Sequence, residues 1–133
     1  MTINMKLFLL AFVFSVSVFQ QKADPVEKTV ALIKQSSIKE LVKTFAPNVE
    51  MTVLTEEGVY SKEQAETILN NFFAKNPIVS VKIIHRVDSN PEYRYAVCTL
   101  TTKNGNFRTS ISLRSSSGSF VVSEFRIEEE KGK

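Results

Sequence analysis

Hydrophobic and polar residues recur with two different periods along the chain, and the change of period separates helices from strands. Apolar residues between positions 26 and 45 recur every three or four residues, which predicts helical structure, divided into two short helices at Gln35–Ser37. Asp24 and Pro25 are typical of a helix start, because aspartate caps free backbone N–H groups and proline suits the first helical position. Positions 49–54 alternate with period two and predict a strand.

A further helix is predicted over residues 61–75, after a short return strand at Val59–Tyr60. Ser61 and Gln64 have the spacing of a capping box, in which each residue satisfies a free N–H group of the other. Five apolar residues then share one face of this helix, namely Ala65, Ile68, Leu69, Phe72 and Phe73. Such a face must be buried, so we expect the helix to pack on a sheet.

Four longer strands are predicted in the rest of the chain, at about 78–87, 94–102, 106–114 and 119–128. Asn104–Gly105 is typical of a two-residue hairpin turn, which places Leu100 opposite Thr109 on an apolar face. A three-residue turn with Gly118 in the left-handed conformation is predicted to follow. Four later residues then join the apolar face, namely Val121, Ser123, Phe125 and Ile127.

The order of these elements predicts the fold class. Helices come first, followed by a two-stranded piece, another helix and a four-stranded antiparallel meander. Helices must then cover one face of a curved antiparallel sheet, which is an α+β arrangement in a single domain over residues 24–130. The one cysteine, Cys98, excludes an internal disulfide, and its place on the apolar face predicts a thiol of low reactivity in the core.

An unbroken run of apolar and serine residues, Leu7–Phe19, lies near the N-terminus. Its 13 residues are too few for a membrane-spanning helix, which needs about 20. With Lys6 before it and a polar QQK sequence after it, the run predicts a secretory signal peptide over residues 1–23, cleaved after Ala23. The alternative is an uncleaved anchor or a buried N-terminal helix. We therefore expect an exported product, periplasmic or secreted, with no stable membrane insertion after cleavage.

Charge limits the possible partners. The chain has 17 basic and 14 acidic residues, and loss of Lys6 and Lys22 with the leader leaves 15 basic residues. This near balance argues against nucleic-acid binding, which needs a clustered basic face. One histidine and one cysteine lack the ligand spacing of a metal site, and no phosphate-binding glycine loop occurs, so no metal or cofactor is predicted.

The single histidine, His85, is the candidate for chemistry. Strand alternation places it on the apolar face opposite Ala96, where a pocket could open, with Tyr60 and Phe72 as further pocket candidates. Imidazole titrates near about pH 6.5, so His85, aided by Tyr60, could act as an acid or base. The alternative is a structural histidine at the rim of the core. No carboxylate is predicted inside the apolar cavity, which argues against isomerase chemistry.

The opposite, polar face of the predicted sheet offers a candidate interface. The candidate residues include types that are enriched at protein interfaces, and they are Tyr95, Arg108, Arg114, Phe120 and Val122. The two arginines could also meet an anionic group. A homodimer through this face is the expected assembly, and an ordinary solvated sheet face is the alternative.

Four parts of the sequence carry a family resemblance, namely YSKEQAETILNNFFAKNP (60–77), the His85 position, YAVCTLTTKNGNFRTSISL (95–113) and FRIE (125–128). They resemble an uncharacterised family of small exported bacterial proteins, found mainly in Bacteroidetes, and the resemblance covers about residues 25–128. It implies the cone-shaped, cystatin-like fold shared by nuclear transport factor 2 and ketosteroid isomerase, whose relatives often dimerise through the outer sheet face. The family tends to have glycine and serine after the histidine, whereas this chain has Arg86–Ser89.

The family has no established activity, so the resemblance implies fold and export and no chemistry. Three functions remain open. They are a non-catalytic binding or assembly module, a small-molecule enzyme using His85 as acid or base, and a structural homodimerisation unit. The enzyme needs an open pocket with convergent polar groups, so an interior filled by Met51, Phe72 and Phe73 would argue against it.

Overall fold

Three helices and six strands make up residues 24–131, the part of the chain that this computed structural model describes. In chain order they are α2 (Pro25–Lys34), α3 (Ile38–Lys43), β1 (Phe45–Val53), β2 (Glu56–Ser61), α4 (Lys62–Lys75), β3 (Ile78–Val87), β4 (Tyr93–Thr102), β5 (Gly105–Ser116) and β6 (Ser119–Glu129). The predicted signal peptide, residues 1–23, lies outside the described residues. Within residues 24–131, no helix has the length and apolar content needed to cross a membrane.

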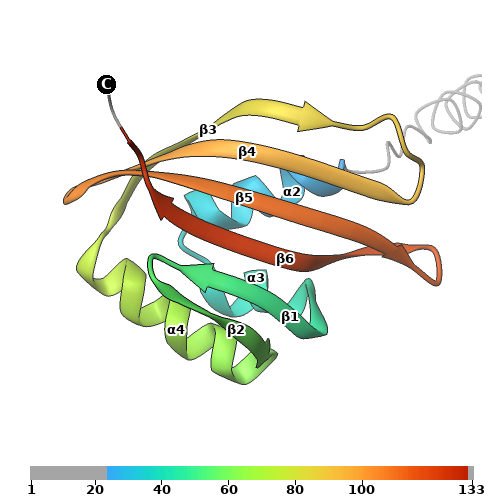
Figure 1. The fold of residues 1–133 in the computed structure, drawn as a ribbon, viewed down its shortest axis with the longest axis horizontal. Helices are drawn as coiled ribbons and strands as arrows, with labels where there is room; N and C mark the ends of the chain where they lie inside the picture. Colours follow the sequence, from blue (N-terminus) through green and yellow to red (C-terminus); the bar gives the residue numbers. More distant parts are fainter. Residues whose placement is uncertain (1–23, 132–133) are drawn as a thin grey trace, which may run out of the picture.

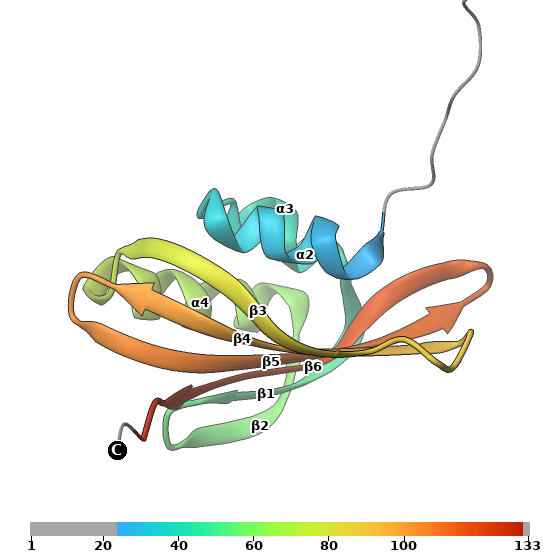
Figure 2. The same ribbon diagram turned by 90° about the horizontal axis from the view of Figure 1, so that it is seen from above.

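The six strands form one curved sheet in the order β2-β1-β6-β5-β4-β3. β1 runs parallel to β6, and the other neighbouring strands are antiparallel. All three helices lie on one side of the sheet, which we call the helix face, and the described residues leave the opposite, outer face uncovered (Figures 1 and 2). The predicted α+β arrangement is confirmed, and the first strand joins the meander beside its last strand.

Local sequence signals fix the starts of α2 and α4. Asp24 accepts hydrogen bonds from the backbone N–H groups of Val26 and Glu27, at 2.9 and 3.4 Å, and so caps α2. At the start of α4, the Gln64 backbone N–H donates to Ser61 Oγ at 3.2 Å, and the Ser61 N–H donates to Gln64 Oε1 at 3.0 Å. The predicted capping box is therefore confirmed.

Aromatic side chains occupy the space between the sheet and the helices. The Phe72 ring packs edge-on against the rings of Phe73 and Phe107, each at a centroid distance of 5.1 Å. These three side chains and Met51 are all buried. All four belong to the hydrophobic core, in the interior where the enzyme hypothesis requires a pocket.

The β4–β5 hairpin differs from the predicted register. Thr102 pairs with Gly105, so the two-residue loop is Lys103–Asn104. Thr102 Oγ1 donates to the Gly105 carbonyl at 2.8 Å and accepts from the Asn104 N–H at 3.1 Å, which fixes the turn one residue earlier than predicted. The two strands are therefore displaced by two residues relative to the prediction, which leaves the same residues on each face.

A β-bulge in β3 changes the face on which His85 lies. His85 pairs with Val97, whereas Arg86 pairs with Ala96, so Ile84 is an extra residue in β3. An extra residue reverses the alternation of faces along a strand. The predicted position of His85 opposite Ala96 is therefore wrong, because the bulge turns His85 to the outer face and Arg86 to the helix face.

A second irregularity, in β6, buries Val122. Ser123 is an extra residue between the paired positions Val122 and Glu124. Val122 is 0% exposed, so the prediction that it belongs to an outer-face interface is wrong, and it takes the core position predicted for Val121. Phe120 also packs against the core on the helix face rather than on the outer face.

Candidate functional site

The structure does not bring the predicted catalytic residues together. His85 is exposed on the outer face of β3, whereas Tyr60 on β2 packs against the core. β2 and β3 are the two edges of the sheet, with four strands between them. Ala96 and Phe72, the other pocket candidates, are buried in the core. His85 and Tyr60 therefore have no common site.

Arg86 instead joins the start of α2 to the end of β3. Its Nη2 lies 2.8 Å from Asp24 Oδ2, and its Nη1 lies 3.4 Å from Glu27 Oε2. Its Nε donates to Asp88 Oδ2 at 3.0 Å. We call these four residues the Arg86 cluster. The arginine side chain is only 24% exposed, so water screens its ion pairs less than it screens pairs on an open surface.

The ionisation of the cluster follows from these contacts. Burial raises the pKa of Asp24, but hydrogen bonds from Arg86 and from the backbone of Val26 and Glu27 outweigh it and hold that pKa below its ordinary value of 3.8. The hydrogen bond to Asp88 is the largest of the contacts that raise the pKa of Arg86. Asp24 and Arg86 therefore stay ionised at neutral pH, and the cluster acts as a fixed ionic link between helix and sheet.

A hollow of about 750 Å³ opens beside this cluster, at the end of the sheet where α2 begins. We call it the end hollow, and its lining is Asp24, Pro25, Lys28, Arg86, Asp88, Arg94, Gly118, Ser119 and Phe120. Figure 2 shows the β5–β6 hairpin curling toward the helix face, beyond the first turn of α2. The hairpin ends in Ser117–Gly118, a two-residue turn with φ of 51° and 85°, one residue shorter than predicted.

Arg94 and Phe120 form one wall of the end hollow. The guanidinium of Arg94 lies over the Phe120 ring, 4.9 Å from its centroid. Its Nη1 donates to the backbone carbonyls of Tyr93, at 3.1 Å, and of Asn90. Its Nε lies 3.7 Å from Asp88 Oδ1. The guanidinium is thus held in a fixed orientation at the edge of the hollow.

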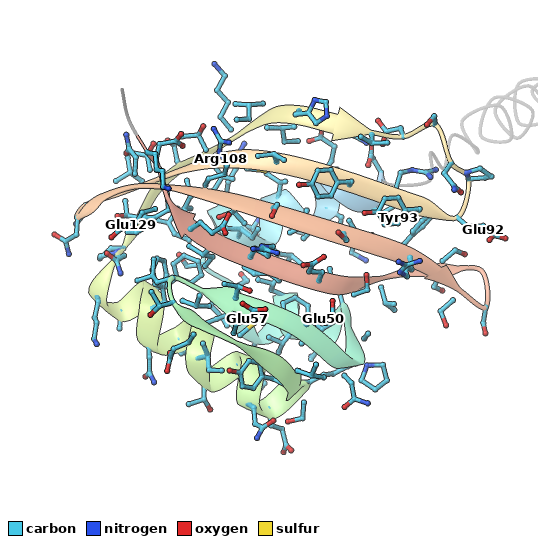
Figure 3. All side chains as sticks on the ribbon, viewed as in Figure 1. Glu50, Glu57, Glu92, Tyr93, Arg108 and Glu129 are labelled. Atoms are coloured by element: carbon cyan, nitrogen blue, oxygen red, sulfur yellow. The ribbon has the colours of Figure 1, made fainter. Side chains whose placement is uncertain are left out.

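The outer face carries the remaining interface candidates, Tyr95, Arg108 and Arg114. The Arg114 guanidinium lies over the Tyr93 ring, 5.4 Å from its centroid, and the Tyr93 hydroxyl donates to Ser112 Oγ at 3.3 Å. Figure 3 looks onto this face and shows Tyr93 and Arg108 on neighbouring strands. Within residues 24–131, Arg114 makes no ion pair, so its charge is available to a partner.

Other arginines of the outer face are already paired. Arg126 Nη1 lies 3.3 Å from Glu124 Oε2, and its Nη2 lies 3.0 Å from Glu128 Oε2. Arg108 Nη2 lies 3.2 Å from Glu130 Oε2. Exposed pairs of this kind are common on solvated sheet faces and contribute little to stability.

Comparison with known proteins identifies the family. The sequence matches DUF4783, a domain of unknown function, over residues 26–128. The chain belongs to the DUF4783 family. The structure resembles that of a DUF4783 family protein from Bacteroides uniformis, with a TM-score of 0.76 and 23% identity, over 82% of this chain and 100% of that chain. This membership confirms the predicted family resemblance.

More distant structures share the fold of this DUF4783 domain. A ketosteroid isomerase-like protein from Erwinia carotovora atroseptica has a TM-score of 0.63 and 13% identity, over 78% of this chain and 89% of that chain. An NTF2-like protein of unknown function from Pseudomonas putida has a TM-score of 0.61 and 10% identity, over 77% and 80%. No curated protein matches the sequence. These likenesses confirm the expected nuclear-transport-factor-2-like fold.

Sequence reasoning missed the arginines that line the end hollow of this DUF4783 domain. One signal was present for Arg86, because the adjacent Ile83 and Ile84 break the alternation of a regular strand and so indicate a bulge. A bulge before His85 turns Arg86 to the helix face. Arg94 gave no such signal, since it stands at the predicted start of an ordinary strand.

The single thiol of the DUF4783 domain is unreactive. Cys98 is buried, and burial raises the pKa of its thiol to about 11, so the thiolate is scarce at neutral pH. The predicted core position of Cys98 is confirmed. In the part of the chain from 24 to 131, no three histidine, cysteine, aspartate or glutamate side chains gather as metal ligands would.

Proposed function

We propose that this DUF4783 domain is an exported, non-catalytic binding module that takes its ligand in the end hollow. The observation that carries the proposal is the wall formed by Arg94 and Phe120, a fixed cation over an aromatic ring. Small-molecule sites usually measure about 300–1,000 Å³ and combine apolar lining with a few fixed polar groups. The end hollow, at about 750 Å³, combines both.

Two other hollows of the domain fit a ligand less well. One of about 610 Å³ lies near the C-terminal end of β6 and is lined mainly by charged residues, including Arg108 and Glu128–Lys131. Another, of about 310 Å³ on the outer face, contains Arg114 and Tyr93, but Arg114 is exposed there. In the end hollow, by contrast, the Arg94 side chain is only 22% exposed. A partly buried cation contributes more to the binding of an anion than an exposed one.

The lining of the end hollow favours binding over catalysis. It contains no histidine or cysteine, and its two carboxylates, Asp24 and Asp88, are both ion-paired with Arg86. The lowered pKa of Asp24 makes it a weak proton acceptor at neutral pH. Ser119 has no histidine beside it in the lining that could activate its hydroxyl.

A fragment screen followed by amide NMR spectra of the mature protein tests the ligand site. We expect bound fragments to shift the amides of Lys28, Arg94 and Ser119, which line the end hollow. Phe120→Ser should remove these shifts, whereas Val59→Ser, at an exposed site on β2, should leave them unchanged. Fragments that shift only outer-face amides would refute the site, and conversion of a fragment to a product would refute the non-catalytic part.

Export is tested separately by expressing the full chain in a bacterium and sequencing the N-terminus of the protein from its envelope or medium. We expect the mature sequence to begin at Asp24. Protein that remains in the cytoplasm with residues 1–23 attached would contradict export.

The outer face supports a second candidate function, homodimerisation. The observation that favours it is the pair of Arg114 and Tyr93 beside half-buried Tyr95 and Val97, on a face that no described helix covers. Arginine and tyrosine are enriched at interfaces. If a dimer forms through this face, Arg114→Glu combined with Tyr95→Asp should reduce its mass in solution to that of a monomer. An unchanged mass would exclude this face.

A further inference from the structure

We propose that the ligand of the end hollow is a singly charged oxyanion, such as a carboxylate or sulfonate, joined to a flat apolar body. Lys28 and Arg94 bind the oxyanion, and Phe120 and Pro25 contact the apolar body. This inference rests on the proposed function, because it names the class of ligand for the same hollow.

The charges of the lining favour a single negative charge. The hollow is lined by three cations, Lys28, Arg86 and Arg94, and by two carboxylates, Asp24 and Asp88. The two carboxylates lie 2.8 and 2.9 Å from Arg86 Nη2, and Asp88 Oδ1 also lies 3.7 Å from Arg94 Nε. Three cations and two carboxylates give the lining one net positive charge, which a singly charged ligand would balance. A second negative charge on the ligand would lie near Asp24 and Asp88 and would be repelled.

Arg94 is suited to bind an oxyanion because its orientation is already fixed. The backbone carbonyls of Tyr93 and Asn90 engage its Nη1, and Asp88 lies near its Nε. Within the described residues, Nη2 has no hydrogen-bond partner. Nη2 therefore has N–H groups with which to form a charge-assisted hydrogen bond to an oxygen of a carboxylate or sulfonate. Little side-chain entropy is lost on binding, since the Phe120 ring already supports the group.

Lys28 supplies a second cation of a different kind. It lies in the first turns of α2, where its backbone N–H donates to the Asp24 carbonyl at 2.9 Å, and its side chain is exposed. Between residues 24 and 131, its ammonium has no ion-pair partner. Its flexible stem allows the charge to follow oxyanions at different positions, whereas Arg94 sets one fixed position.

Arg86 is a positioning residue and does not contact the ligand. Its three nitrogen atoms already bind carboxylates of Asp24, Glu27 and Asp88. Arg86 also holds the Asp88 carboxylate, which lies 3.7 Å from Arg94 Nε. Loss of Arg86 should therefore loosen Arg94 as well as α2.

Two dyes of similar shape separate charge from apolar contact. Anilinonaphthalene sulfonate carries one negative charge, whereas phenylnaphthylamine has a similar ring system and no charge. We would titrate each dye into the mature protein, follow its fluorescence, and locate it from amide shifts. We expect both dyes in the end hollow, with the sulfonate dye bound about tenfold more tightly because it alone contacts Lys28 and Arg94.

Variants assign the binding energy to residues. Lys28→Gln and Arg94→Gln should each lower the affinity for the sulfonate dye about three- to tenfold and leave the affinity for the uncharged dye unchanged. Phe120→Leu should lower the affinity for both dyes. Lys39→Gln is the matched control, because Lys39 is an exposed lysine on α3 outside the hollow. A native amide spectrum for each variant excludes unfolding, and Arg94→Lys is the second variant if Arg94→Gln does not fold.

Competition by small anions tests the need for the apolar body. Benzoate should displace the sulfonate dye at a concentration at least about tenfold lower than inorganic phosphate does. Equal displacement would overturn the requirement for an apolar body. Equal affinity for the two dyes, with both in the end hollow, would overturn the anionic ligand class and leave the proposed function standing. If neither dye shifts the amides of the end hollow, both the ligand class and the proposed function are wrong.

Discussion

Two arginines of this domain are each held between carboxylates, but only one of them joins separate elements. Arg126 pairs with Glu124 and Glu128, which are two positions away on the same strand, and its side chain is 39% exposed. Arg86 pairs with Asp24, the N-cap of α2, which is 62 residues away in the sequence. The pairs of Arg126 can form in any extended strand, so they add little to folding. The link from Arg86 to Asp24 forms only when α2 has packed on the sheet, so it stabilises that packing.

The largest expected effect comes from Arg86→Glu, which reverses the charge that lies between Asp24, Glu27 and Asp88. Like-charged carboxylates would then repel one another between α2 and β3. We expect the free energy of unfolding, measured with urea at neutral pH, to fall by about 2–3 kcal/mol. Arg126→Glu, whose partners lie on its own strand, should cost less than about 1 kcal/mol. Equal costs would show that the pairs between elements contribute no more than the pairs within a strand.

The next effect is that of Arg86→Met, which keeps the length of the side chain and removes its charge. Asp24 and Asp88 would lose their cation while remaining partly covered by α2 and the sheet. We expect a loss of about 1–2 kcal/mol in the free energy of unfolding at neutral pH. Amide hydrogen exchange should also become faster in α2 than in α4. Unchanged exchange in α2 would contradict the role of Arg86 in holding that helix.

Acid should reduce the difference between the wild type and Arg86→Met. The pKa of Asp24 is below its ordinary value of 3.8 in the folded protein, so the ionised form stabilises folding above about that pH. This stability is lost as the pH falls through the lowered pKa of the folded state. Urea unfolding from neutral pH down to about pH 3 should therefore show a constant difference that shrinks below about pH 4. If the difference in unfolding free energy stays constant over the whole pH range, Arg86 stabilises the fold through packing and not through charge.

The smallest effect is expected for Arg126→Gln, which breaks two pairs within one strand. We expect the free energy of unfolding to change by no more than about 0.5 kcal/mol, measured with urea at neutral pH. A loss as large as that of Arg86→Met would contradict the comparison, because it would mean that pairs within a strand stabilise the fold as much as pairs between elements.

The parts of the fold that could be predicted depend on signals between residues close in sequence. Asp24 before Pro25, and Ser61 three residues before Gln64, fixed the helix starts because capping needs only a few neighbouring residues. The order of strands followed from alternation and turns. These signals were enough for the α+β class, since the class depends on the order of elements and not on details of register.

The candidate site could not be predicted because it depends on two bulges and on a distant pair. The extra residues Ile84 and Ser123 reverse the alternation of faces along β3 and β6, and so decide where His85 and Val122 lie. A strand pattern gives the period but not the position at which the period fails. The pairing of Arg86 with a carboxylate at the start of α2 needs the folded chain.

The double role of Asp24, as helix cap and as partner of Arg86, gives the proposed leader cleavage a measurable consequence. If the leader is removed after Ala23, the first residue of the mature chain serves both purposes. A cut one bond later, or an aminopeptidase that trims one residue, would leave a chain beginning at Pro25 without either contact. We expect that chain to lose about 1–2 kcal/mol of unfolding free energy against urea, relative to the chain that begins at Asp24. If export and cleavage occur as proposed, the position of a single peptide-bond cut would set the stability of the product.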